Sequence, residues 1–228
     1  MDRAAYFYRS LSLPTLRPNL VEEFYGGSLG LEVVRGPRGL DIQIGATKLC
    51  FVKSEIAASF HFAIDIPENQ IREAHAWLHE RAPVVRSGEF EVHRFESWNA
   101  DAVYFFDPAG NIVEFIGRHS LPNASELPFG PRSLLAVSEL GIPVPDVAAA
   151  LDDVGRSLGW TPYRDPAPDF AAVGSELGLL ILVREGRTWF PTESMAAQSF
   201  PAAIEIDIAT RFKPFQIGGT EIRLFSAD

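Results

Sequence analysis

The pattern of apolar and polar positions changes period sharply within the segment "FHFAIDIPENQIREAHAWLHERA", which begins at Phe60. Over residues 60–66 large apolar side chains alternate with small or polar ones, which is the period-two pattern of a strand. After Pro67 the apolar residues Ile71, Ala74 and Leu78 are spaced by three and four, which indicates a helix. The segment therefore predicts a strand whose apolar face is covered by the helix that follows.

The next segments predict further strands. "EVHRFES" (91–97), "AVYFFD" (102–107) and "NIVEFI" (111–116) carry strand-like runs, and "DPAG" between the last two is typical of a turn. The predicted order is strand, helix and about three strands. We interpret residues 58–118 as one βαβββ module.

The chain contains an internal repeat of this module. A shift of 78 positions aligns "HFAIDIPE" (61–68) with "ELGIPVPD" (139–146), and "GGSLGLEVV" (26–34) matches "GRSLGWTPY" (155–163). Four segments each have a glycine at or next to their start and run into a predicted last strand: "GATKLCF", "AGNIVEF", "GSELGLLILV" and "GGTEIRLF".

The repeat predicts an α+β fold built of four modules. Their ranges are 4–53, 58–118, 134–185 and 200–226, and the last is too short to contain a helix. The Pro-, Ser- and Gly-rich segment 119–133 is the predicted linker. We therefore expect two lobes of two consecutive modules each, over residues 1–120 and 134–228.

Composition and charge restrict the classes of partner. The 228 residues carry a formal net charge of -10, which disfavours nucleic acid and anionic membrane surfaces as partners. The single cysteine, Cys50, permits no intrachain disulfide, and no segment has the pattern of a signal peptide or of a bilayer span. We expect a cytoplasmic protein that binds a small molecule.

The modules resemble the vicinal oxygen chelate superfamily, which includes glyoxalases, bleomycin resistance proteins and extradiol dioxygenases. "HFAIDIPENQIREAHAWL", "VYFFDPAGNIVEFI", "FYGGSLGLEVV" and "SELGIPVPDV" carry the resemblance. It implies that paired modules form curved mixed sheets around a cavity. It also implies a divalent metal ion (Fe, Mn, Ni or Zn) held by His or Glu from first strands and by Glu from last strands. His61 and Glu114 match a first-strand and a last-strand ligand, so the resemblance implies that both bind metal and take part in catalysis.

The other modules depart from this ligand pattern. In the first module the corresponding positions are Tyr8 or Ser10, between which the spacing does not decide, and Cys50. Cysteine thiolate can bind a metal, whereas Tyr and Ser seldom do. In the second lobe the first-strand position is Glu139, and the last-strand positions fall approximately on Leu182 and on Arg223. We expect no second metal site there.

The alternation along "NIVEF" also gives Glu114 a direction. Val113 and Phe115 share one face, so the carboxylate of Glu114 points to the other face, where a buried charge needs a metal, a cation, a donor or water. A solvated carboxylate, or a partner for an arginine, is the alternative. For His61 the alternative is a hydrogen bond within the sheet.

Residues around the hairpin between the second and third strands are candidates for substrate binding. These are Trp98, Asn99, Asp101 and Tyr104, with His93 and Cys50 as further candidates. His93 is also compatible with proton transfer or with an exposed strand edge. The pair His75 and His79 has the i, i+4 spacing of a metal site, but no third ligand is suggested, and we expect a solvated helix flank.

Two functions remain open. The first is a metal-dependent lyase, isomerase or dioxygenase that chelates neighbouring oxygens of a small substrate. The second is a metal-free binding protein of the bleomycin-resistance kind, which the positions of Cys50 and of Tyr8 or Ser10 favour. A homodimer is compatible with either function, although two lobes in one chain reduce the need for it.

Overall fold

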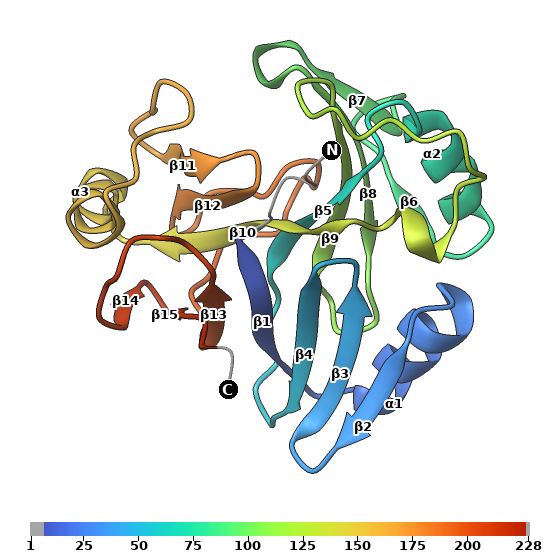
Figure 1. Cartoon of the computed structure of the whole chain (residues 1–228), viewed down its shortest axis with the longest axis horizontal. Helices are drawn as coiled ribbons and strands as arrows, with labels where there is room; N and C mark the ends of the chain where they lie inside the picture. The colour runs from blue at the N-terminus through green and yellow to red at the C-terminus, as the bar shows by residue number, and fades with distance from the viewer. Residues whose placement is uncertain (1–6, 227–228) are drawn as a thin grey trace.

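The computed structural model, which describes residues 7–226, contains two large mixed sheets (Figure 1). The first sheet has the order β14-β15-β13-β1-β4-β3-β2. The second has the order β11-β12-β10-β5-β9-β8-β6, with β7 paired to β8. The α+β class and the βαβββ modules expected from the sequence are confirmed.

The first module contains β1 (Tyr8–Thr15), α1 (Pro18–Glu22), the short π-helix Glu23–Ser28, β2 (Val33–Gly36), β3 (Gly39–Ile44) and β4 (Thr47–Lys53). The second contains β5 (His61–Ile66), α2 (Ile71–His79), β6 (Val84–Val85), β7 (Val92–Phe95), the 3-10 turn Glu96–Trp98, β8 (Ala100–Phe106) and β9 (Ile112–Arg118). The third contains β10 (Ala136–Val144), α3 (Val147–Leu158), β11 (Phe170–Ser175) and β12 (Gly178–Arg184), and the fourth contains β13 (Ala202–Ile206), β14 (Phe215–Ile217) and β15 (Thr220–Leu224).

The fourth module has no described helix between β13 and β14, as expected. In the third module, only an isolated bridge between Pro162 and Val173 stands where a further strand was expected. The predicted linker 119–133 is an irregular segment that ends in the 3-10 turn Pro131–Ser133. Among the described helices, none combines the length and apolar character required to cross a bilayer.

The sheets combine the modules in a way that the sequence did not predict. Each sheet joins one module from residues 1–120 with one from residues 134–228, because β5 pairs antiparallel with β10 and β1 pairs antiparallel with β13. The curved sheet expected within each lobe is instead formed between lobes. All first strands carry a similar alternating pattern, so the pattern identifies strands without identifying their partners.

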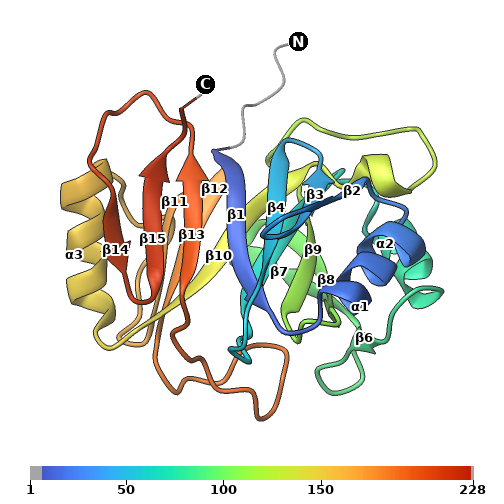
Figure 2. The ribbon, with the colours of Figure 1, turned by 90° about the horizontal axis from the view of Figure 1, so that it is seen from below.

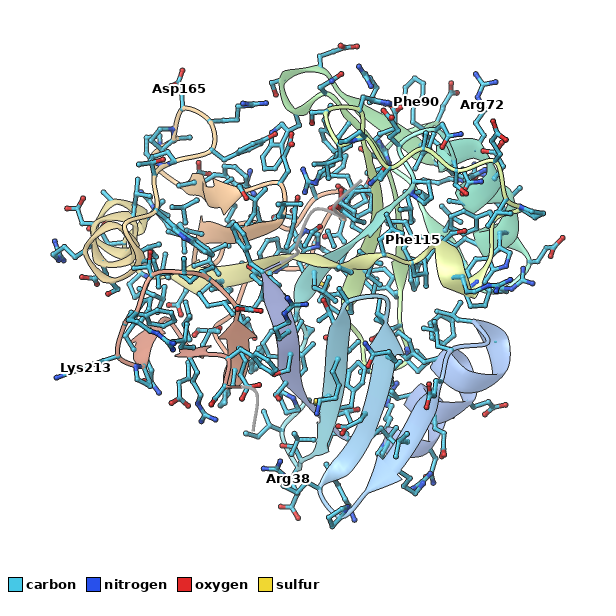
Figure 3. The ribbon with its side chains drawn as sticks, viewed as in Figure 1. Arg38, Arg72, Phe90, Phe115, Asp165 and Lys213 are labelled. Atoms are coloured by element: carbon cyan, nitrogen blue, oxygen red, sulfur yellow. The ribbon has the colours of Figure 1, made fainter. Side chains whose placement is uncertain are left out.

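The helices cover the faces of the sheets that carry large apolar side chains. Ala74 and Leu78 of α2 are buried, as the helical spacing predicted, and the core continues through Phe115. Phe115 lies inside the molecule in Figure 3, whereas Phe90 and Arg72 lie at its edge. Figure 2 shows α3 at one end of the sheets and α1 and α2 at the other. The opposite face of the second sheet carries His61, Glu114 and Glu139 among apolar residues such as Ile116 and Ile181, and it forms the candidate site.

Candidate functional site

Three adjacent strands of the second sheet bring together one imidazole and two carboxylates. β5 and β9 are parallel with Ala63 opposite Glu114, while β5 and β10 are antiparallel with Ala63 opposite Glu139. Each of His61, Glu114 and Glu139 offers a ligand atom within 4.8 Å of the others. The three residues are 7%, 3% and 4% exposed, so the group is buried.

His61 is oriented by the backbone of the neighbouring strand. Its Nδ1 lies 3.3 Å from the carbonyl oxygen of Ile112, and Nε2 lies 3.5 Å from Oε2 of Glu114. Since a carbonyl oxygen only accepts hydrogen bonds, this contact favours a proton on Nδ1 and leaves the Nε2 lone pair directed at the carboxylates. This is the tautomer that metal binding through Nε2 requires.

Burial suppresses charge on both members of this pair. It lowers the pKa of His61, against the opposing effect of Glu139 and of the Ile112 carbonyl. It raises the pKa of Glu114 well above its ordinary value, and the nearby charge of Glu139 raises it further. Burial thus disfavours the charged form of both His61 and Glu114, and a bound cation would offset this cost for the carboxylate.

A buried arginine provides the positive charge beside this group. Arg118 is fully buried, donates to Glu139 through Nη2 and donates through Nε to Oδ1 of Asp65 at 3.2 Å. Burial alone would lower the pKa of Arg118, but Glu139 and Asp65 together raise it. Ser138 also donates to Asp65 at 2.7 Å. One guanidinium thus faces three carboxylic acids, and this excess of acidic groups favours a further cation.

The three residues lie at the floor of a cavity of about 300 Å³. Its walls are mainly aromatic and apolar, with Arg187 as a further polar group: Phe95, Trp98, Tyr104, Ile116, Phe170, Ile181, Trp189 and Phe190. The ring of Trp189 lies 5.3 Å from that of His61 and is held against Gly141, where an added Cβ would lie 2.4 Å from the indole. The segment 185–199, which follows β12, thus contributes Arg187, Trp189 and Phe190 to the cavity lining, and it was not anticipated from the sequence.

Two of the predicted substrate-binding residues line the cavity. Tyr104 lies on β8 with its ring 6.2 Å from that of His61, and burial and the charge of Glu114 raise the pKa of its hydroxyl well above the ordinary value. Trp98 lines the same cavity and packs on Tyr163 at 5.3 Å between ring centres.

Asn99 and Asp101 lie outside the cavity lining. Asn99 has a positive φ of 48° and ends the 3-10 turn, which is a structural use of asparagine. Asp101 bonds to His119 at 2.8 Å and pairs with Arg94 at 3.5 Å. Asn99 therefore has a structural role in the turn, and Asp101 has a structural role in pairing with surface side chains.

His93 and Cys50 are also separated from the three donors. His93 packs beside Tyr104 and Phe190, behind the cavity wall, and burial lowers its pKa. Within residues 7–226 its Nε2 has no hydrogen-bond partner. Cys50 lies on β4 of the first sheet, so it does not contribute to this cavity.

Sequence reasoning missed the position of Glu139 at this site. The shift of 78 positions already aligns residue 139 with His61, but the expected lobes placed the two residues apart. The strand register also moves the predicted last-strand position from Leu182 to Ile181. Glu139 pairs with Leu179, and Ile181 lies two residues further along that strand. In the same way His61 pairs with Ile112, and Glu114 lies two residues further along. Ile181 lines the cavity and offers no metal ligand.

The donor set fits a divalent metal ion. One imidazole nitrogen and two carboxylate oxygens suit Zn, Mn, Fe or Ni, and the apolar side chain at Ile181 leaves coordination positions open for water or substrate. Arg118 engages Oε1 of Glu139, and that carboxylate has a second oxygen. His61 and Glu114, which the resemblance implied, are thus joined by Glu139.

Comparison with solved structures supports the fold. The chain is similar to a candidate dioxygenase from Bacillus subtilis subsp. subtilis str. 168, with 14% identity, a TM-score of 0.61, and coverage of 91% of this chain and 72% of that one. It is also similar to glyoxalase I from Zea mays, with 16% identity, a TM-score of 0.55, and coverage of 90% and 75%. No family model matches the sequence, and no curated protein matches it. The chain therefore has the fold expected for the vicinal oxygen chelate superfamily.

Proposed function

We propose that this protein is a divalent-metal-dependent enzyme of the glyoxalase or dioxygenase type that acts on a small substrate with neighbouring oxygen atoms. The observation that carries the proposal is the buried group of His61, Glu114 and Glu139, whose ligand atoms lie within 4.8 Å of one another. A bound ion would supply Lewis-acid chemistry to the substrate oxygens. The named neighbours support this class of reaction but do not select one.

The residues of the chain have separate roles in this proposal. His61, Glu114 and Glu139 hold the ion, and Arg118 orients Glu139 through its ion pair. Because burial raises the pKa of Glu114, this carboxylate is a stronger base than an exposed glutamate and would serve as the proton acceptor of the site. Tyr104, whose hydroxyl interacts with Glu114, positions that carboxyl. The aromatic walls exclude water and select an apolar or aromatic substrate body.

A cavity of about 300 Å³ limits the substrate to a small molecule. All three donors come from one chain, so the site is complete without a second copy. A homodimer and a cytoplasmic location remain predictions.

A metal-free binding protein is the second candidate, and the ion pair between Arg118 and Glu139 favours it. The guanidinium already neutralises one of the proposed ligands, and Ile181 supplies none at the fourth position. In this alternative the aromatic cavity sequesters an apolar compound without changing it.

Metal analysis of tag-free protein separates the two candidates. We expect wild-type protein to bind one more ion per chain than the His61→Ala, Glu114→Gln double variant, after dialysis against Mn, Fe, Ni or Zn. The matched control is the Ser10→Ala, Cys50→Ala variant, which changes the corresponding positions of the other sheet and should retain the ion. Equal metal content in wild type and the cavity double variant contradicts the enzyme proposal and supports the binding protein.

A further inference from the structure

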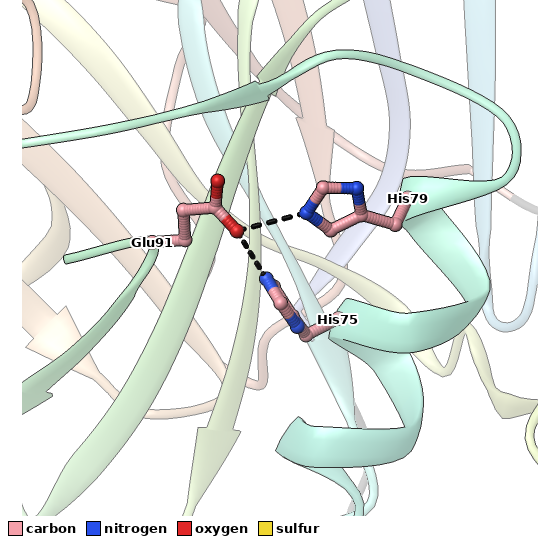
Figure 4. A group of neighbouring side chains, drawn as sticks. All are labelled: His75, His79 and Glu91. Carbon is pink, nitrogen blue, oxygen red and sulfur yellow. Dashed lines mark hydrogen bonds and ion pairs between the residues drawn. The ribbon is translucent and has the colours of Figure 1, made fainter. Parts of the chain in front are cut away.

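A second group of metal-ligating side chains lies between helix α2 and the segment before β7, outside the cavity lining (Figure 4). Nε2 of His75 lies 2.7 Å from Oε2 of Glu91, and Nε2 of His79 lies 2.8 Å from the same oxygen. Figure 4 shows both imidazoles directed from the helix toward this one carboxylate. The three residues offer ligand atoms within 4.8 Å of one another.

The local structure holds these residues in place. Burial of Ala74 and Leu78 fixes the rotation of α2, so His75 and His79 follow one another on the adjacent side of the helix. Ser87 and Phe90 exchange backbone hydrogen bonds of 3.0 and 3.2 Å, which close a tight hairpin just before Glu91. The site therefore stands on a packed helix and a closed turn.

The two oxygens of Glu91 have different partners. Arg86 donates through Nε to Oε1 at 2.6 Å, while Oε2 faces the two imidazoles. Hydrogen bonds with His79 and His75, together with Arg86, lower the pKa of Glu91 to about 2, so the carboxylate is ionised at neutral pH. An outer partner that fixes the free oxygen of a ligating carboxylate is a usual feature of metal sites.

We propose that His75, His79 and Glu91 form a second, peripheral site for a divalent transition-metal ion such as Zn²⁺. Two imidazole nitrogens and one carboxylate oxygen are three of the four ligands of a tetrahedral zinc site. The groove beside His79 and Glu91, with a volume of about 480 Å³, leaves room for water as the fourth. The helix i, i+4 pair is thus more than the solvated flank expected from the sequence, because the fold supplies a third ligand.

The bound ion would join the end of α2 to the hairpin that precedes β7. Its ligands come from elements that contribute nothing to the group of His61, Glu114 and Glu139, so the peripheral site does not depend on the proposed function of the cavity. At neutral pH the ion would replace the hydrogen bonds that now connect the two segments.

The test uses tag-free protein in which the cavity site has been removed by His61→Ala and Glu114→Gln. We expect this protein to bind one Zn²⁺ per chain in calorimetric titration, and Co²⁺ to give a visible absorption band. Adding His79→Gln should weaken Zn²⁺ binding at least about tenfold. Adding His119→Gln, which removes a half-exposed histidine bonded to Asp101, should leave the affinity unchanged.

Thermal melting with and without a chelator checks that each variant is folded. Zn²⁺ should raise the melting temperature of the parent and of the His119 variant, and not that of the His79 variant. Absence of Zn²⁺ binding to the folded parent overturns the proposal, as does equal binding by the His79 and His119 variants.

Discussion

The two sheets repeat one architecture, yet their corresponding faces differ in chemistry. Strand register aligns four positions of the second sheet with four of the first. The positions are His61, Glu114, Glu139 and Ile181 in the second sheet and Ser10, Cys50, Ala203 and Arg223 in the first. Only the second sheet therefore has a set of side chains that can bind a metal ion at these positions.

Burial differs between these faces as much as residue type does. Trp189 and its segment close the second face, and the ion pairs of Arg118 there are almost fully buried. On the first face Arg223 pairs with Glu221, with both side chains substantially exposed to water. The repeated fold thus supplies equivalent positions in both sheets. Burial by neighbouring segments and the charge of the side chains decide which of these positions form a site.

Among substitutions that compare the two sheets, loss of the buried guanidinium of Arg118 should reduce the free energy of unfolding the most. Arg118→Met leaves Asp65 and Glu139 without their buried cation, which we expect to reduce the free energy of unfolding by about 3–5 kcal/mol. Arg223→Met removes an exposed pair and should cost about 0–1 kcal/mol. Urea unfolding of both variants in chelator measures the difference, and equal costs would mean that the buried network does not stabilise the second sheet.

Filling the space that Gly141 leaves for the indole of Trp189 should reduce the free energy of unfolding by a smaller amount. Gly141→Ala places a methyl group against the indole, so we expect a loss of about 1–3 kcal/mol and a red shift of the tryptophan emission. The corresponding position of the first sheet is Glu205, which is half-buried and has no such cover. Glu205→Ala should cost under about 1 kcal/mol, mainly through its hydrogen bond from Ser10.

An unshifted emission spectrum for Gly141→Ala would show that Trp189 is not held by the close approach of the glycine backbone. The same variant should weaken binding of small molecules to the cavity, whereas Glu205→Ala should not. Dye displacement from the cavity distinguishes the two.

The sequence predicted the modules well because each depends on local periodicity. The alternation of residues 60–66 and the helical spacing from Ile71 to Leu78 appear in the structure as β5 and α2. The same local argument directed Glu114 to the face opposite Val113 and Phe115, and the structure places it there.

The pairing of strands could not be predicted, because it depends on contacts between residues distant in the chain. The internal repeat aligns Glu139 with His61, but no local sequence pattern indicates that β10 lies beside β5. Arg118 follows Glu114 on the same face of β9, yet its partners Asp65 and Glu139 come from two other strands. Long-range register, rather than residue type, assembled the site.

Changes at Cys50 should have the smallest effect on stability and metal binding. This residue is the counterpart of Glu114 on the first sheet, which has no group of metal ligands at these positions. Burial, reinforced by Asp41, raises the pKa of its thiol to about 12. The thiol therefore stays protonated through neutral pH, and at pH 8 iodoacetamide should modify it about a thousandfold more slowly than an exposed cysteine. The rate should rise about tenfold for each pH unit above 8, as measured by mass spectrometry.

Cys50→Ala should change the free energy of unfolding by less than about 1 kcal/mol and leave metal binding at His61, Glu114 and Glu139 unchanged. Its sulfur makes a long contact of 3.9 Å with the carbonyl of Lys48 and weak interactions with Asp41 and Ser12. Rapid modification at pH 8, or metal lost with the thiol, would instead give the first sheet a functional role. Slow modification of Cys50, together with unchanged metal binding by the Cys50→Ala variant, would indicate that the metal site lies on the second sheet alone. There the carboxylate of Glu114 is buried beside two further donors.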